Sequence, residues 1–282
     1  MEKINEFEGE VEELENYKFL FVDIDGTMLT SDKQVQKSTL HTFEELKKIG
    51  VEVVITSGRQ RSNCNKIAGI VGSGRYVISA NGADVYDRET GKKIYQNTIL
   101  WEDIQKINKI VDKYNLRVRY VCEDTGLVNK DILNPLDETL FENYDDIKDK
   151  DIPQVVLYFT SRETFDEVKK EIAKISGIKV INQNKNMDNQ KTYFMDVVSA
   201  GTSKGLAIKK LLKSVNIPRF ASVSIGDGVN DASMFEVTGV SVAMGNAVKK
   251  CIEKAQIVTS SNDEDGIYNA CVNLFDIPEF YE

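Results

Sequence analysis

The stretch "FLFVDIDGTMLT", residues 19–30, places two carboxylates at the end of an apolar segment. Phe19 to Val22 are predicted to form a buried strand, because a short apolar run bounded by turn residues is typical of a strand covered on both faces. Asp23 and Asp25 follow with one residue between them, and a Gly-Thr pair then indicates a turn. Two ionised carboxylates this close repel each other, and burying either is costly without a partner. A cation, a phosphate or a turn is therefore needed to explain the two carboxylates.

Strand and helix patterns alternate on both sides of a long middle segment. The N-terminal part predicts strands at 18–23, 51–56 and 76–79 and helices at 36–49 and 62–71. The C-terminal part predicts strands at 221–225, 240–244 and 256–259 and helices at 202–215 and 265–275, and "GNA" at 245–247 is expected to open another helix. This alternation favours an α/β fold with a doubly wound, Rossmann-like parallel sheet.

The middle segment has a different organisation. Between residues 84 and 195, strands such as "QVVLYFT" mix with amphipathic helices such as "WEDIQKINKIVDKY", and glycine-rich turns are absent. We interpret it as an inserted α+β domain, so that residues 17–83 and 196–282 form one core domain. Residues 1–16 are interpreted as an acidic N-terminal extension.

Composition excludes several classes of protein. The 282-residue chain has a formal net charge of −9, which argues against nucleic-acid binding. No run approaches the roughly 18 apolar residues of a membrane span, and the polar N-terminus does not resemble a secretion signal. The four cysteines show no paired spacing, so they are expected to be reduced in a cytoplasmic protein: Cys64, Cys122, Cys251 and Cys271. No feature predicts an oligomeric state.

Acid-base chemistry is expected to fall to carboxylates. The single histidine, His41, lies in a helical pattern and is predicted to face solvent. A Ser-His or Cys-His mechanism would depend on this residue alone, so Asp and Glu are the better candidates for general acid and base.

Polar clusters follow the predicted strands. They are Asp23/Asp25, Ser57-Gly58-Arg59, Asn81-Gly82 and Asp227/Asn230/Asp231. Ligands of parallel sheets bind beyond the carboxyl ends of the strands, so these clusters are expected to meet in one site. Asp23 and Asp227 can converge on Mg²⁺, which prefers oxygen ligands and substrate phosphate. A bound cation would also offset the repulsion in the first stretch.

A phosphate substrate would give the other residues roles. Ser57 and Gly58 offer a hydroxyl and backbone N–H groups at a strand-to-helix turn, Lys204 a positive charge and Asn230 an amide. Arg59 is instead interpreted as part of a structural ion pair, and Asn81 as structural.

The two adjacent carboxylates would then act on the same phosphoryl group. Asp23 can act as nucleophile and form an aspartyl-phosphate. Asp25 can protonate the leaving oxygen, with a pKa that the neighbouring carboxylate would raise, and can later activate water.

The motifs resemble those of the haloacid dehalogenase superfamily of phosphohydrolases. "DIDGT", "TSGR", "GTSKG" and "GDGVNDASMF" occur in the expected order, and "NGA", "VAMGNA" and "TSSNDEDGI" are similar to the Cof-type branch. The resemblance implies a nucleophilic Asp23, and an Asp25 that is acid/base and lends its backbone carbonyl to magnesium. It also implies Asp227 as a metal ligand, Asp231 as a supporting carboxylate of the metal site, and an α/β cap at residues 84–195.

Function hypotheses from different classes remain open. The first is a Mg²⁺-dependent phosphatase that hydrolyses a small phosphorylated metabolite, with sugar phosphates favoured. A phosphomutase or phosphotransferase would use the same "DIDGT" motif. A catalytically idle regulatory protein is disfavoured because Asp23, Asp25, Lys204 and Asp227 are all present. Receiver domains and P-type ATPases also form an aspartyl-phosphate, but they lack the second Asp and the ATPases need membrane spans.

Overall fold

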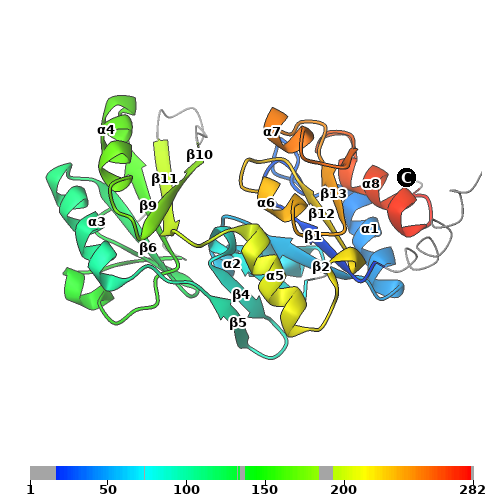
Figure 1. Cartoon of the computed structure of the whole chain (residues 1–282), viewed down its shortest axis with the longest axis horizontal. Helices are drawn as coiled ribbons and strands as arrows, with labels where there is room; N and C mark the ends of the chain where they lie inside the picture. The colour runs from blue at the N-terminus through cyan, green and yellow to red at the C-terminus, as the bar shows by residue number, and fades with distance from the viewer. Residues whose placement is uncertain (1–16, 73, 132, 134–136, 184–192, 281–282) are drawn as a thin grey trace, which may run out of the picture.

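The computed structural model describes residues 17–72, 74–131, 133, 137–183 and 193–280. In this part of the chain two sheets, each with its own helices, are joined by connections in the middle of the molecule (Figure 1). The N-terminal extension predicted at residues 1–16 lies outside the described residues.

The first sheet has eight strands in the described part of the chain. In spatial order they are β14 (Ile257–Val258), β13 (Val240–Ala243), β12 (Ser222–Gly226), β1 (Phe19–Val22), β2 (Glu52–Thr56), β3 (Tyr76–Ser79), β4 (Asp84–Asp87) and β5 (Lys92–Gln96). The six from β14 to β3 are parallel, and β4 and β5 are antiparallel additions. The expected α/β class with a parallel core sheet is confirmed.

Helices cover both faces of this sheet. Successive β1 side chains point to opposite faces, so Leu20 and Phe21 belong to different hydrophobic clusters. The Leu20 cluster includes α1 (Lys37–Lys48), α2 (Arg61–Ile70) and α8 (Gly266–Phe275). The Phe21 cluster includes α5 (Lys204–Ser214), α6 (Ala232–Phe235) and α7 (Lys249–Ile252). Short 3-10 helices occur at Ala80–Gly82, Tyr144–Ile147 and Arg219–Ala221.

The second sheet has six strands in the described residues. They are β10 (Ile178–Gln183), β11 (Tyr193–Ser199), β9 (Gln154–Phe159), β6 (Arg117–Cys122), β7 (Thr125–Val128) and β8 (Glu138–Leu140). Two helices, α3 (Trp101–Lys113) and α4 (Arg162–Ile172), cover the face that points away from the first sheet (Figure 1). Alternation along β9 sends Val155, Leu157 and Phe159 toward these helices, which leaves the other face free to line a cavity. This is the expected inserted α+β cap.

The sheet pairing differs from the predicted insert boundaries. β4 and β5 lie inside the segment predicted to start at residue 84, yet they pair with β3 in the first sheet. The 3-10 turn at Ala80–Gly82 reverses the chain after β3, which brings β4 back beside it. β11 belongs to the second sheet and extends to Ser199, beyond the predicted end at 195. A strand pattern shows which residues are extended but does not name the partner strand.

Other predictions about the chain can be compared directly. The helix expected to open at "GNA" begins instead at Lys249, after a turn at Gly245 and Asn246. All four cysteines are buried and unpaired, as predicted. No helix among the described residues is both long and apolar enough to cross a bilayer.

Candidate active site

A cavity of about 840 Å³ lies between the two sheets, at the carboxyl ends of β1, β2 and β12. It is lined by seven of the residues predicted from the sequence: Asp23, Asp25, Ser57, Gly58, Lys204, Asp227 and Asn230. They meet because neighbouring parallel strands end at the same sheet edge. The eighth predicted residue, Asp231, is fully buried and reaches the site through an ion pair with Lys204. His41 lies on α1, outside the cavity lining.

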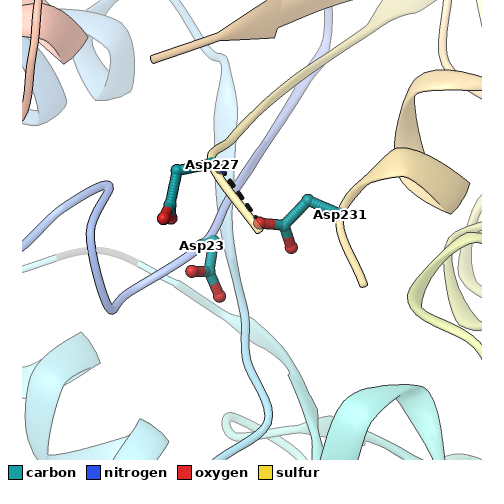
Figure 2. Close-up of side chains that lie close together, drawn as sticks. All are labelled: Asp23, Asp227 and Asp231. Carbon is teal, nitrogen blue, oxygen red and sulfur yellow. Dashed lines mark hydrogen bonds between the residues drawn. The ribbon is translucent and has the colours of Figure 1, made fainter. Parts of the chain in front are cut away.

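Three carboxylates form a compact acidic cluster. One carboxylate oxygen from each of Asp23, Asp227 and Asp231 lies within 4.8 Å of the others (Figure 2). The Oδ2 atom of Asp231 accepts the backbone N–H groups of Asp227 at 3.0 Å and of Gly228 at 2.8 Å. These bonds fix the start of the loop after β12. Clustered carboxylate oxygens match the donor preference of Mg²⁺, so the side chains present fit that ion.

Gly26 and Thr27 position Asp227. Gly26 has a φ of +82°, and a Cβ atom there would lie 2.5 Å from Asp227 Oδ2. Glycine is therefore required both for the backbone conformation and for the approach of the carboxylate. The Thr27 hydroxyl donates to Asp227 Oδ1 at 2.9 Å. The turn after β1 thus supports a carboxylate of the acidic cluster that is 200 residues away in sequence.

Lys204 is the counter-charge of the cluster. It is the first residue of α5, whose N-cap Ser203 accepts the N–H of Leu206 at 3.0 Å. Its ammonium lies 2.6 Å from both Asp23 Oδ1 and Asp231 Oδ1. Burial lowers the pKa of Lys204, but the two carboxylates outweigh burial and raise it above its usual value. The ammonium therefore remains charged at every physiological pH.

The carboxyl of Asp23 is shielded from water. Burial, with the charges of Asp231 and Asp227, raises the pKa of Asp23 to about 8, although Lys204 acts in the opposite direction. A divalent cation among these carboxylates would favour their ionised forms.

The prediction of a raised pKa for Asp25 is wrong for this structure. Arg59 Nε and Nη2 each donate to the Asp25 carboxylate at 2.8 Å, and Lys33 Nζ lies 3.2 Å from Oδ1. Partial burial would raise the pKa of Asp25, but Arg59 and Lys33 together hold it well below its usual range. The carboxylate of Asp25 contacts two cations farther along the chain, so their charges dominate over that of its sequence neighbour Asp23.

The predicted phosphate contacts are only partly available. The backbone N–H of Ser57 donates to the Ile78 carbonyl at 2.8 Å, so this group is used by the sheet. The Ser57 hydroxyl accepts the N–H of Arg59 at 3.2 Å and still has its own proton to donate. The Asn230 amide donates to Asn81 Oδ1 at 3.1 Å. Asn81, interpreted from the sequence as structural, also donates to Asp196 Oδ2 at 3.2 Å and so connects the two sheets.

Several contacts around the cavity carry no signal in the sequence. Arg59 sits in the "TSGR" motif, but only the fold shows that it pairs with Asp25. The cavity-facing side chains of the second sheet come from separate strands and share no motif. We call them the second-sheet wall, and they include Arg119, Val121, Gln154, Val156, Tyr158 and Lys179.

Comparison with known proteins assigns this chain to a family. The sequence model of haloacid dehalogenase-like hydrolases matches residues 20–271. The chain belongs to the haloacid dehalogenase-like hydrolase family. The Bacillus subtilis (strain 168) protein YkrA is 31% identical over 265 residues, which cover 91% of this chain and 97% of YkrA. The expected superfamily is therefore confirmed.

Two further relatives bear on activity and fold. YcsE of Bacillus subtilis (strain 168), a 5-amino-6-(5-phospho-D-ribitylamino)uracil phosphatase, is 26% identical over 259 residues, which cover 90% of this chain and 94% of YcsE. The crystal structure of a haloacid dehalogenase-like hydrolase from Bacteroides thetaiotaomicron superposes with a TM-score of 0.82 at 23% identity. That match covers 92% of this chain and all of the other, so the two proteins share the fold. The predicted enzyme class, a phosphatase, agrees with these relatives.

Proposed function

We propose that this hydrolase is a Mg²⁺-dependent phosphatase that removes phosphate from a small phosphorylated metabolite through an aspartyl-phosphate on Asp23. The observation that carries the proposal is the position of Asp23 in the cavity, 2.6 Å from the Lys204 ammonium and within the acidic cluster. A nucleophilic carboxylate needs nearby positive charge to approach an anionic phosphoryl group, and Lys204 provides it.

In the proposed reaction an Asp23 carboxylate oxygen attacks the phosphorus atom, and the bond from phosphorus to the leaving oxygen breaks. Asp25 gives its proton to that oxygen. In the second step Asp25 takes a proton from water, the resulting hydroxide attacks phosphorus, and the bond to the Asp23 oxygen breaks. Ser57, Gly58, Lys204 and Asn230 would hold the other phosphoryl oxygens. Asp23, Asp227, Asp231 and the Asp25 backbone carbonyl would hold Mg²⁺, which supplies charge neutralisation when it is bound.

The ion pair of Asp25 with Arg59 must change before the first step. Asp25 can donate a proton only after its carboxylate has been protonated, which the two cations oppose. The dianionic phosphoryl group would compete with Asp25 for Arg59 and Lys33. Loss of these two cations, together with the negative charge of the phosphoryl group, would raise the pKa of Asp25. Substrate binding would thus favour the protonated form of Asp25, which can act as general acid.

We propose that the second sheet acts as a cap that selects the substrate. Its wall lines the cavity together with Asp23, and the cavity has space for a small leaving group. A closed cavity excludes bulk water, which favours phosphoryl transfer to Asp23. YcsE acts on a phosphate carried by a ribityl chain, which supports a sugar-like leaving group for this chain. We place the protein in the cytoplasm, consistent with its unpaired cysteines.

The proposal is tested by measuring phosphate release from a panel of sugar, nucleotide and cofactor phosphates with Mg²⁺ present. Product analysis by NMR separates a phosphatase from a phosphomutase or phosphotransferase, because only hydrolysis yields inorganic phosphate in proportion to the dephosphorylated product. No release from any ester would contradict the proposed function.

Removing divalent metal is expected to abolish hydrolysis and to lower stability. The three clustered carboxylates repel one another, so a cation that binds only the folded state stabilises it. At a Mg²⁺ concentration 100 times the Kd, linkage gives about 2.7 kcal/mol. Thermal unfolding with EDTA and with added Mg²⁺ measures this independently of activity. An unchanged melting temperature together with full activity of the metal-free protein would contradict the assignment.

Lys204→Met is expected to destabilise the protein as well as inactivate it. The substitution leaves Asp23 and Asp231 buried without their ammonium partner. Removing one partner of a buried ion pair typically costs about 3–5 kcal/mol. Urea denaturation measures the change, and Lys213→Met, at an exposed position near the end of the same helix, is the control. A loss below about 1 kcal/mol, as for a surface ion pair, would show that Lys204 does not balance this cluster.

A further inference from the structure

The second-sheet wall contains a lysine, Lys179, that forms no ion pair with the described residues. Lys179 lies on β10, is half-buried and lines the cavity. Among the described residues no carboxylate lies within ion-pair distance of its ammonium, and loss of solvent alone lowers the pKa of Lys179. A partly buried charge without a partner is costly, and it attracts an opposite charge strongly in a site of reduced polarity.

The neighbouring strand β11 carries a carboxyl group, but this group forms no ion pair with Lys179. Asp196 on β11 is adjacent to Ile181, two residues from Lys179 on β10. Its carboxylate is occupied by hydrogen bonds from Asn81 and Gln154, and it is almost fully buried. The positive charge of Lys179 therefore remains directed at the space between the sheets.

One more atom of the wall lacks a hydrogen-bond partner. Gln154 is only 3% exposed, and its Oε1 atom is buried with no donor among the described residues. Gln154 lines the same cavity as Lys179. Arg119 lines it as well, but its Nε atom packs against Gly126 and lies 3.7 Å from Glu138 Oε1, so its charge already has a partner. Buried polar atoms without partners are rare, so an acceptor and a cationic group here indicate a ligand.

We infer that the leaving group of the substrate carries hydroxyl groups and a second anionic group, which binds Lys179 at the second-sheet wall. Gln154 Oε1 would accept a hydroxyl of the same leaving group. The inference rests on the proposed function and narrows its substrate class to phosphorylated sugar acids and sugar bisphosphates. Neutral hydroxyl groups alone would leave the Lys179 ammonium without a counter-charge.

Three open-chain esters that differ only at one end test this inference. Sorbitol 6-phosphate is neutral at C1, 6-phosphogluconate carries a carboxylate there, and sorbitol 1,6-bisphosphate carries a phosphate. The wild-type protein is expected to have a kcat/KM about 10- to 100-fold higher for one or both anionic esters than for sorbitol 6-phosphate, as a charged hydrogen bond provides. The preferred ester identifies a carboxylate or a phosphate as the second group.

Lys179 variants separate a direct contact from a structural role. Lys179→Met should remove the preference by lowering kcat/KM for the anionic esters alone, whereas Lys179→Arg should retain most of it. Lys170→Met, an exposed lysine on α4, is the matched control and should behave as wild type. Equal loss for all three esters, or an unchanged preference in Lys179→Met, would overturn the inference.

Binding measurements distinguish failure of this inference from failure of the proposed function. In an Asp23→Asn background, calorimetry with the three esters reports affinity without turnover. Tighter binding of an anionic ester that is lost on adding Lys179→Met supports the second-anion site, whether or not the wild-type protein hydrolyses any ester. If the wild-type protein hydrolyses none of them, only the proposed phosphatase activity is overturned. Equal affinities overturn the second-anion site even if all three esters are hydrolysed. Absence of binding by any of them overturns it as well.

Discussion

Asp23→Asn is expected to lower the hydrolysis rate of every phosphate monoester by about 10⁴-fold or more, on the scale seen when a nucleophile is removed. Asn cannot attack phosphorus, so no covalent intermediate can form. The protein should remain folded, because Lys204 keeps its second partner, Asp231, at 2.6 Å. Initial rates and the mass of acid-quenched protein measure the two effects.

A matched control for this variant is Asp166→Asn, at a half-exposed aspartate of α4 outside the cavity. It should retain wild-type rates. If Asp23→Asn still turns over and the wild-type protein shows no phosphate-sized adduct on Asp23 under any quench, the nucleophile assignment is wrong. Direct attack by water would then be the better mechanism.

Asp25→Asn is expected to slow both half-reactions by on the order of 10²–10⁴-fold, as for the loss of a general acid-base. An ester with a good leaving group, such as p-nitrophenyl phosphate, needs little protonation, so its first step should be affected less. Hydrolysis of the intermediate then becomes rate-limiting, and phosphorylated Asp23 should accumulate. Mass spectrometry of the acid-quenched variant detects this species.

The dependence on leaving group distinguishes acid-base chemistry from a loss of structure. A misplaced loop in Asp25→Asn would slow good and poor leaving groups alike, without accumulation of the adduct. Arg59→Met provides a second comparison, because it removes the strongest cation on Asp25 while keeping the carboxyl. In this variant the pKa of Asp25 should rise toward its usual range, so the carboxylate should gain its proton at higher pH.

The surroundings of Asp25 show that neighbours in sequence do not determine the pKa of a side chain. From the stretch at residues 19–30 alone, the nearest charge to Asp25 is Asp23, and a raised pKa follows. In the folded protein the nearest charges are Arg59 and Lys33, which reverse the shift. Asp25 pairs with the cations that the fold brings close to it. One of them, Arg59, is positioned by the turn between β2 and α2.

Much of the core could be predicted from local patterns. The strands at β1, β2, β3, β12 and β13 and the helices α1, α2, α5 and α8 were expected within two residues of their observed ends. Apolar runs, turn residues and helical periodicity are local properties, and the parallel order follows from their alternation. Parallel strands present their carboxyl ends at one edge of the sheet, so Asp23, Ser57 and Asp227 could be predicted to lie in one site, and all three line the cavity.

The tertiary structure alone decided which strands pair and which side chains meet across the cavity. β4 and β5 join the first sheet, although an extended segment could hydrogen-bond to either. Arg119, Gln154 and Lys179 come from three strands of the second sheet, and no spacing in the sequence relates them. The proposed catalytic carboxylates are recognisable because their chemistry requires a fixed local backbone, including Gly26. The proposed substrate-binding wall requires only that side chains of suitable charge face one cavity, and many sequences satisfy this through long-range contacts.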